Sequence, residues 1–175
     1  QLRREDANSW AAGVLMPPAK SIDVLRMTAE DYPAAELGTL PVVRMEGIDH
    51  IIIEQQSFYY NLRNNRKLTE SIIRTICGIL DSECLGMMFL ADGGKEREMT
   101  PLVYVPGADT MFWENSCASG TVAAGQYLAA KAGEAVSAAL KEPGGTLVVE
   151  SDPETGETWL FGGTKLRDQL TLKLT

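Results

Sequence analysis

The spacing of apolar and polar residues along the chain predicts a domain with many short strands. Two runs rich in β-branched residues, 40–45 and 50–54, are separated by a short polar connection that contains Gly47. We expect further apolar runs, each bounded by turns with proline, glycine or aspartate, to be strands. These runs are 12–16, 85–90, 101–105, 110–113, 146–150 and 158–161.

Three other segments are less regular. Residues 134–141 fit a helix through their alanines, yet the glycines on either side would equally bracket a strand. Residues 22–31 suggest an irregular stretch with one helical turn, starting near Thr28. The leucines at 170, 172 and 174 alternate as in a strand with one buried face.

Two segments have the pattern of helices. Residues 68–80 place apolar side chains at helical spacing with charged ones opposite, which predicts an amphipathic helix. The alanine-rich segment that follows Cys117 is small and apolar nearly all round, which indicates a buried helix that other backbone approaches closely. The expected fold is therefore α+β, with a curved mixed β-sheet wrapped around a central buried helix.

Length and charge restrict the classes of protein. The chain of 175 residues fits a single domain or one large lobe, and its net charge of −8 argues against a nucleic-acid surface. Its apolar runs are too short to span a bilayer, so we expect a soluble, cytoplasmic protein with no membrane partner. The three cysteines have no zinc-site spacing, and no metal is expected.

Candidate chemistry centres on Cys117, which follows a polar corner and precedes the buried helix. The first amides of a helix lack partners within it and favour negative charge, so a thiolate and an anionic substrate group could both be stabilised there. A cysteine before an alanine-rich helix is, taken alone, more often a packed core residue. Cys77 and Cys84 fit structural or incidental positions.

Four motifs resemble the diaminopimelate epimerase superfamily, which includes proline racemase and histidine racemase relatives. Residues 117–121, Cys-Ala-Ser-Gly-Thr, are similar to its second cysteine motif, Cys-Gly-Ser/Thr-Gly, with Ala118 in place of the first glycine. Residues 43–50 resemble its Met-Gly-Asn-Pro-His strand end, Trp113-Glu114 its Trp-Glu-Arg element, and 143–147 its Gly-Gly-x-Leu hairpin.

The resemblance implies an isomerase, built from two pseudo-symmetric halves with one catalytic cysteine in each. By this resemblance residues 12–175 form a diaminopimelate epimerase-like, C-terminal lobe, and residues 1–11 form a linker or inter-lobe segment. The expected partners are the N-terminal half of the same enzyme, a small amino-acid or carboxylic-acid substrate and a second copy in a homodimer. No cofactor is implied, and the lobe alone is expected to be inactive.

The resemblance also assigns roles to residues. Cys117 is expected to be one acid/base, Glu114 to orient or tune it, and His50 to support the cysteine of the other half. Ile48 replaces a substrate-binding asparagine and Asn115 replaces an expected arginine, which argues against diaminopimelate as the substrate. The predicted substrate-binding residues are Asn115, Ala118, Ser119, Gly120 and Thr121, the last through its hydroxyl.

Three alternatives stay open from the sequence. An allylic isomerase of the methylitaconate type would use the same fold on an unsaturated acid. A binding homologue would keep the fold without catalysis. A Cys-His hydrolase would require His50 within hydrogen-bond reach of Cys117.

Overall fold

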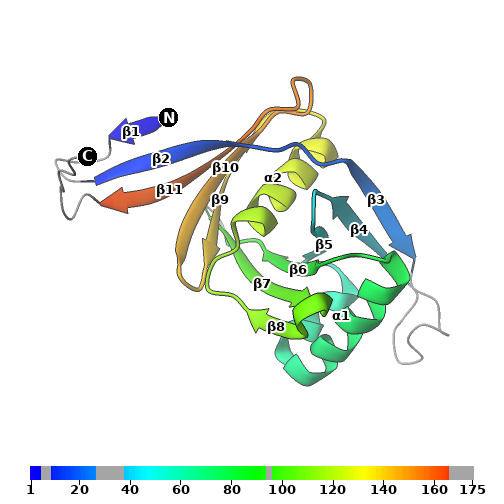
Figure 1. The fold of residues 1–175 in the computed structure, drawn as a ribbon. Helices are drawn as coiled ribbons and strands as arrows, with labels where there is room; N and C mark the ends of the chain where they lie inside the picture. The colour runs from blue at the N-terminus through cyan, green and yellow to red at the C-terminus, as the bar shows by residue number, and fades with distance from the viewer. Residues whose placement is uncertain (5–8, 27–37, 94–95, 166–175) are drawn as a thin grey trace, which may run out of the picture.

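The computed structural model describes residues 1–4, 9–26, 38–93 and 96–165. Within these ranges eleven strands form one sheet in the order β1-β2-β11-β10-β9-β7-β6-β5-β4-β3, with β8 paired to β7 (Figure 1). The strands are β1 Leu2–Arg4, β2 Ser9–Met16, β3 Ser21–Arg26, β4 Thr39–Arg44, β5 Asp49–Glu54, β6 Leu85–Ala91, β7 Arg97–Val105, β8 Thr110–Trp113, β9 Val136–Glu142, β10 Gly145–Ser151 and β11 Thr158–Lys165. The helices are η1 Phe58–Asn64, α1 Arg66–Leu80, η2 Pro106–Ala108 and α2 Ala118–Ala132.

The sheet is mixed because two of its strand pairs are parallel. β5 pairs in parallel with β6, and β7 pairs in parallel with β9, whereas the other described pairs are antiparallel. A parallel pair needs a crossover connection. Helix α1 lies in the first crossover and α2 in the second, so each helix is brought onto the sheet by the connection that contains it.

Helix α2 lies inside the curve of the sheet, where strands from both halves of the sheet order surround it (Figure 1). Its glycines and alanines allow this close approach. A Cβ atom on Gly125 would overlap the side chain of Val149 in β10. The sheet wrapped around a buried helix confirms the fold expected from the alanine-rich sequence.

Helix α1 packs on the opposite face of β5 and β6. Its residues Ile72, Ile73 and Ile76 join a buried cluster with Ile51 and Phe89. Asn65 caps its N-terminus by accepting a hydrogen bond from the amide of Leu68, at 3.3 Å. The predicted amphipathic helix is confirmed and begins two residues earlier than expected, at Arg66.

Helices cover β5 and β6 on both faces, and this explains their uninterrupted apolar sequences. Side chains of a strand alternate between the two faces, so Ile51 and Ile53 join the α1 side whereas Ile52 joins the α2 side. Met88 of β6 also lies on the α2 side, in the cluster that contains Cys117.

Several segments differ from the sequence expectations. Residues 21–26 form strand β3 instead of an irregular stretch, because they pair along their whole length with β4. The ambiguous segment is a strand, β9, paired with both β7 and β10. The possible helical turn at 28–31 and the leucine tail at 166–174 lie outside the described residues.

The N-terminal residues form strands where the structure describes them. β1 pairs with β2, and β2 starts at Ser9 and pairs with β11 over eight positions. Both therefore belong to the sheet and extend away from α2 in Figure 1. The expected boundary at residue 11 falls within β2, and an inter-lobe role for this segment stays a prediction.

Candidate active site

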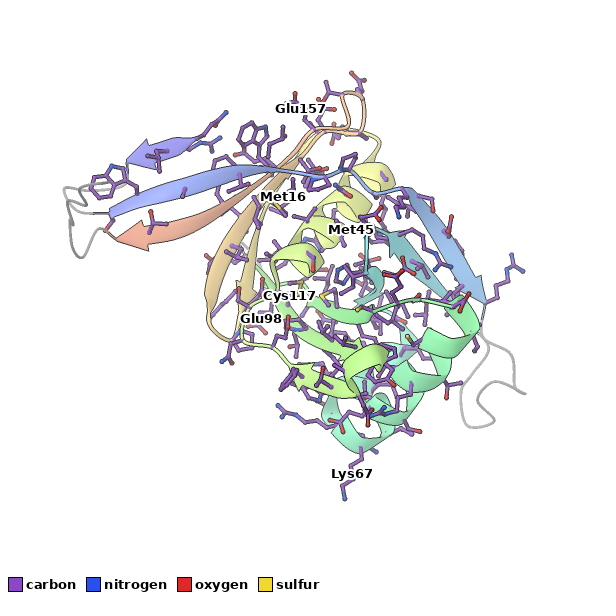
Figure 2. The ribbon with its side chains drawn as sticks, viewed as in Figure 1. Met16, Met45, Lys67, Glu98, Cys117 and Glu157 are labelled. Atoms are coloured by element: carbon purple, nitrogen blue, oxygen red, sulfur yellow. The ribbon has the colours of Figure 1, made fainter. Side chains whose placement is uncertain are left out.

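Cys117 is the N-cap residue of α2 and lies at the point where β8 and its following loop lead into the helix. Figure 2 places it at the N-terminal end of α2, in the interior of the lobe. The residue is 5% exposed, although its neighbours Ser116 and Ala118 are exposed. A buried sulfur thus lies beside a helix end that solvent and small molecules can reach.

The surroundings of Cys117 keep its sulfur in the thiol form. Burial is the largest cause that raises the pKa of the Cys117 thiol to about 12, followed by its hydrogen bond to the Glu114 carboxyl. The Gly120 amide and the Ser119 hydroxyl act in the opposite direction and lower that pKa. The corner therefore contains one group that holds a proton on sulfur and two that stabilise sulfur after the proton leaves.

The amides at the start of α2 are the predicted substrate-binding donors, and that role stays a prediction. Among the described residues no acceptor is found for the amides of Ala118 and Ser119, which precede the first i−4 hydrogen bond of the helix, from Thr121 to Cys117. The Ser119 hydroxyl lies 3.7 Å from the Cys117 sulfur. Donors at a helix N-terminus are suited to an anionic group.

Glu142 is a site residue that the sequence analysis missed. It lies at the end of β9, is 4% exposed, and its Oε2 accepts a hydrogen bond of 2.6 Å from the Cys117 amide. The signal was available in the alternation of β9. Ala138 and Leu140 face the α2 side, and a period of two places Glu142 on the same buried face.

Thr121 has a different role from the expected one. Its side chain is fully buried, and its hydroxyl lies 2.6 Å from Glu142 Oε1 and 2.8 Å from the Cys117 carbonyl oxygen. The Thr121 hydroxyl therefore links Glu142 of β9 to the Cys117 backbone in the protein interior. It is not turned toward the exposed helix end, where the sequence analysis expected it to contact the substrate.

The β9–β10 hairpin supports the loop before α2. The amide of Gly144 donates a 2.6 Å hydrogen bond to the carbonyl oxygen of Asn115. A Cβ atom on Gly144 would lie 2.9 Å from that oxygen, so this close approach favours glycine. Asn115 itself is exposed in the loop before the helix, and its expected contact with the substrate stays a prediction.

His50 lies inside the lobe, on the same side of the sheet as α2. It is fully buried, and burial lowers the pKa of its imidazole to about 4. Among the described residues neither ring nitrogen has a hydrogen-bond partner. The Cys117–His50 hydrogen bond of a hydrolase is therefore not formed, which corrects that alternative. A role of His50 toward a second cysteine stays a prediction.

Cys77 and Cys84 lie away from this corner. Cys77 is buried at the end of α1, and its thiol donates a hydrogen bond of 3.3 Å to the carbonyl oxygen of Ser82. Cys84 is half-buried before β6. Neither of the two α-helices in the described part of the chain has the length and apolar character that a membrane span requires.

Comparison with known proteins identifies the family. A family profile described as the histidine racemase CntK N-terminal domain matches residues 1–160. The chain belongs to this family.

Two histidine racemases from strains of Fusobacterium nucleatum subsp. nucleatum are similar to this chain. One is 33% identical over 125 residues, which cover 69% of this chain and 41% of that protein. The other is 31% identical over 151 residues, which cover 83% of this chain and 50% of that protein. The histidine racemase of Staphylococcus aureus strain Mu50 is 29% identical over 85 residues, covering 48% of this chain and 30% of that protein.

A solved structure, a phenazine biosynthesis PhzC/PhzF protein from Clostridium difficile strain 630, aligns with a TM-score of 0.49 and 13% identity. The alignment covers 97% of this chain and 60% of that one.

The chain spans half or less of the length of these histidine racemases. The profile description names an N-terminal domain, which does not agree with the C-terminal lobe that the motif resemblance implied. The C-terminal position of this chain within a longer enzyme stays a prediction. Sequencing the coding region upstream and downstream of residues 1–175 tests it.

Proposed function

We propose that this chain forms one half of a cofactor-independent racemase or epimerase that inverts an amino-acid α-carbon with two cysteines. The observation that carries the proposal is Cys117, a buried thiol at the N-cap of α2 in a member of the histidine racemase family. Inversion needs a base on one face of the α-carbon and an acid on the other. A single thiol supplies one of these, and a second lobe of the same enzyme supplies the other.

In this mechanism Cys117 acts as the acid when the opposite cysteine acts as the base. The opposite thiolate removes the α-proton, and the Cys117 thiol donates its proton to the other face of the carbon, leaving a Cys117 thiolate. In the reverse direction that thiolate removes the proton. The Gly120 amide and the Ser119 hydroxyl, which lower the pKa of the Cys117 thiol, stabilise the thiolate that forms when the proton is donated.

The first turn of α2 is the proposed binding site for the substrate carboxylate. The amides of Ala118 and Ser119 point out of an exposed helix end and have no acceptor among the described residues. Hydrogen bonds from these amides favour the charge that spreads onto the carboxylate as the α-proton leaves. Asn115, exposed beside them, is the proposed contact to the remainder of the substrate.

Histidine is the first substrate to test, because the similar proteins are histidine racemases. The experiment uses the full reading frame that contains this chain and follows α-proton exchange of L-histidine in deuterium oxide by proton NMR. Cys117→Ser is expected to reduce exchange by at least about 100-fold, the usual contribution of a positioned acid or base. Cys84→Ser, at a half-buried cysteine away from the corner, is the matched control.

α-Proton exchange of L-histidine at the unmodified rate in Cys117→Ser would contradict the proposal. Exchange at the allylic position of an unsaturated diacid, without exchange of amino acids, would favour the methylitaconate-type isomerase. Binding of an amino acid without exchange in the unmodified enzyme would favour a homologue without catalysis.

A further inference from the structure

The carboxyl of Glu142 has no role in the mechanism above, although it is buried against the Cys117 backbone. Its two oxygens have separate donors: Oε2 accepts from the Cys117 amide and Oε1 lies 2.6 Å from the Thr121 hydroxyl. Ser116 contributes a third hydrogen bond. Burial raises the pKa of the Glu142 carboxyl above its ordinary value, whereas the hydrogen bonds from Thr121, the Cys117 amide and Ser116 act in the opposite direction and favour the ionised form.

Glu142 also links two elements that are far apart in sequence. It ends β9, whereas its partners Cys117 and Thr121 belong to the first turn of α2. The carboxylate lies at the positive end of the helix dipole, which favours its charge. Glu142 therefore fixes the helix start against the sheet at the residue that carries the reactive sulfur.

The Glu142 carboxyl also lies close to the residue that carries the sulfur. Its Oε2 is 2.6 Å from the backbone nitrogen of Cys117, and that nitrogen and the sulfur belong to the same residue. A negative charge this close disfavours a thiolate. Glu114, from the loop before α2, is an acidic group whose hydrogen bond and charge raise the pKa of the Cys117 thiol, and its charge also raises the pKa of Glu142.

We propose that Glu142 is a positioning residue for Cys117. Glu142 fixes the Cys117 amide and the Thr121 hydroxyl, and the negative charge of Glu142 keeps the Cys117 sulfur protonated. Glu142 would thereby assign to Cys117 the acid role in the resting enzyme and leave the base role to the opposite cysteine. The assignment of roles rests on the proposed function. The effect on the thiol does not, because it can be measured without turnover.

The chain offers a variant that removes the charge and keeps the hydrogen bonds. In Glu142→Gln the side-chain oxygen can still accept from the Cys117 amide. The new NH₂ group can donate to the Thr121 oxygen, whose hydroxyl then donates to the Cys117 carbonyl at its present 2.8 Å. Glu134→Gln is the matched control, since Glu134 is exposed and follows the opposite end of α2.

The experiment measures the pH dependence of Cys117 alkylation by iodoacetamide in the full-length enzyme, resolved by peptide mass spectrometry from Cys77 and Cys84. Glu142→Gln is expected to raise the alkylation rate of Cys117 at fixed pH about tenfold, equivalent to a thiol pKa lower by about one unit. Its melting temperature should stay close to that of the unmodified enzyme, and Glu134→Gln should leave the profile unchanged.

A Glu142→Gln profile that coincides with the unmodified one, at an unchanged melting temperature, overturns the proposal. If Glu142→Gln does not fold, Glu142→Leu removes the charge with an apolar side chain beside Leu140, and the same rise is expected. Glu142→Asp keeps the charge and should keep alkylation slow. If histidine exchange is absent in the unmodified enzyme but the alkylation shift is present, the proposed function fails and the effect of Glu142 on the thiol stands.

Discussion

The imidazole of His50 occupies the space that a side chain on Gly86 would need. The two residues are register partners on the parallel strands β5 and β6, and a Cβ atom on Gly86 would overlap His50 Nδ1. The same Cβ atom would lie 2.8 Å from the Met88 methyl group. Gly86 therefore makes room for the histidine on the α2 side of the sheet, close to the methionine that packs against Gly120.

Gly86→Ala is expected to destabilise the protein by about 1–3 kcal/mol, because the added methyl group forces the histidine or the strand to shift in a packed core. Urea unfolding measures the change. Gly78→Ala is the matched control. Gly78 lies in α1 with nothing within 4 Å of an added Cβ, so that variant should be about 0.5–1 kcal/mol more stable. Equal effects of the two substitutions would contradict the packing described.

The burial of His50 predicts a pH dependence of stability. The pKa of His50 in the folded protein, about 4, is below the ordinary histidine value of 6.5, so the unfolded chain takes up the proton first as pH falls. The stabilising effect of the neutral ring is complete above pH 6.5 and is lost as pH falls toward 4. The loss is expected to reach about 2–3 kcal/mol near pH 4.5.

The measurement compares the free energy of unfolding at neutral and acid pH for the unmodified protein and for His50→Leu. The leucine variant should lack this part of the acid destabilisation, while the carboxylates contribute equally to both proteins. Parallel pH curves for the two proteins would show that His50 takes up its proton equally in the folded and unfolded states, which would contradict the effect of its burial.

Glu114→Gln is expected to make Cys117 more reactive. Burial is the largest cause that raises the pKa of the Cys117 thiol, and the hydrogen bond to the Glu114 carboxyl and the Glu114 charge raise it further. The uncharged glutamine side chain should therefore lower that pKa. In the unmodified protein the alkylation rate should rise about tenfold per pH unit through the alkaline range, because the thiolate is the nucleophile. A plateau below pH 9 in the unmodified protein would contradict the protonated resting state.

The contact between Gly125 of α2 and Val149 of β10 predicts a compensating pair. Gly125→Ala alone should cost about 1–3 kcal/mol of stability, because its methyl group would overlap the valine side chain. Combined with Val149→Ala it should cost less than the sum of the two single changes. A double-mutant cycle by urea unfolding tests this, and additive costs would argue against direct contact.

The periodicity of the chain was enough to predict most elements. The helix at 66–80 was visible because its apolar stripe is strong, and β5 and β6 because their apolar runs are bounded by polar turns. Strand β3 was not predicted, because four of its first five residues are exposed and only pairing with β4 makes it a strand. Strand β9 was ambiguous for a related reason. Its alanines favour helix locally, and pairing with β7 and β10 decides otherwise.

The site divides in the same way between local and tertiary information. The sequence by itself determined the thiol at a helix start, since Cys117, Glu114 and the amides of Ala118 to Gly120 are neighbours along the chain. It could not show that Glu142, 25 residues away, binds the Cys117 amide, that the Thr121 hydroxyl is turned inward, or that His50 is sealed inside the lobe. Those facts depend on which faces of β5, β9 and α2 meet. Only the closure of the sheet around the helix brings those faces together, because hydrogen bonds and burial between distant segments arise from packing and not from local propensity.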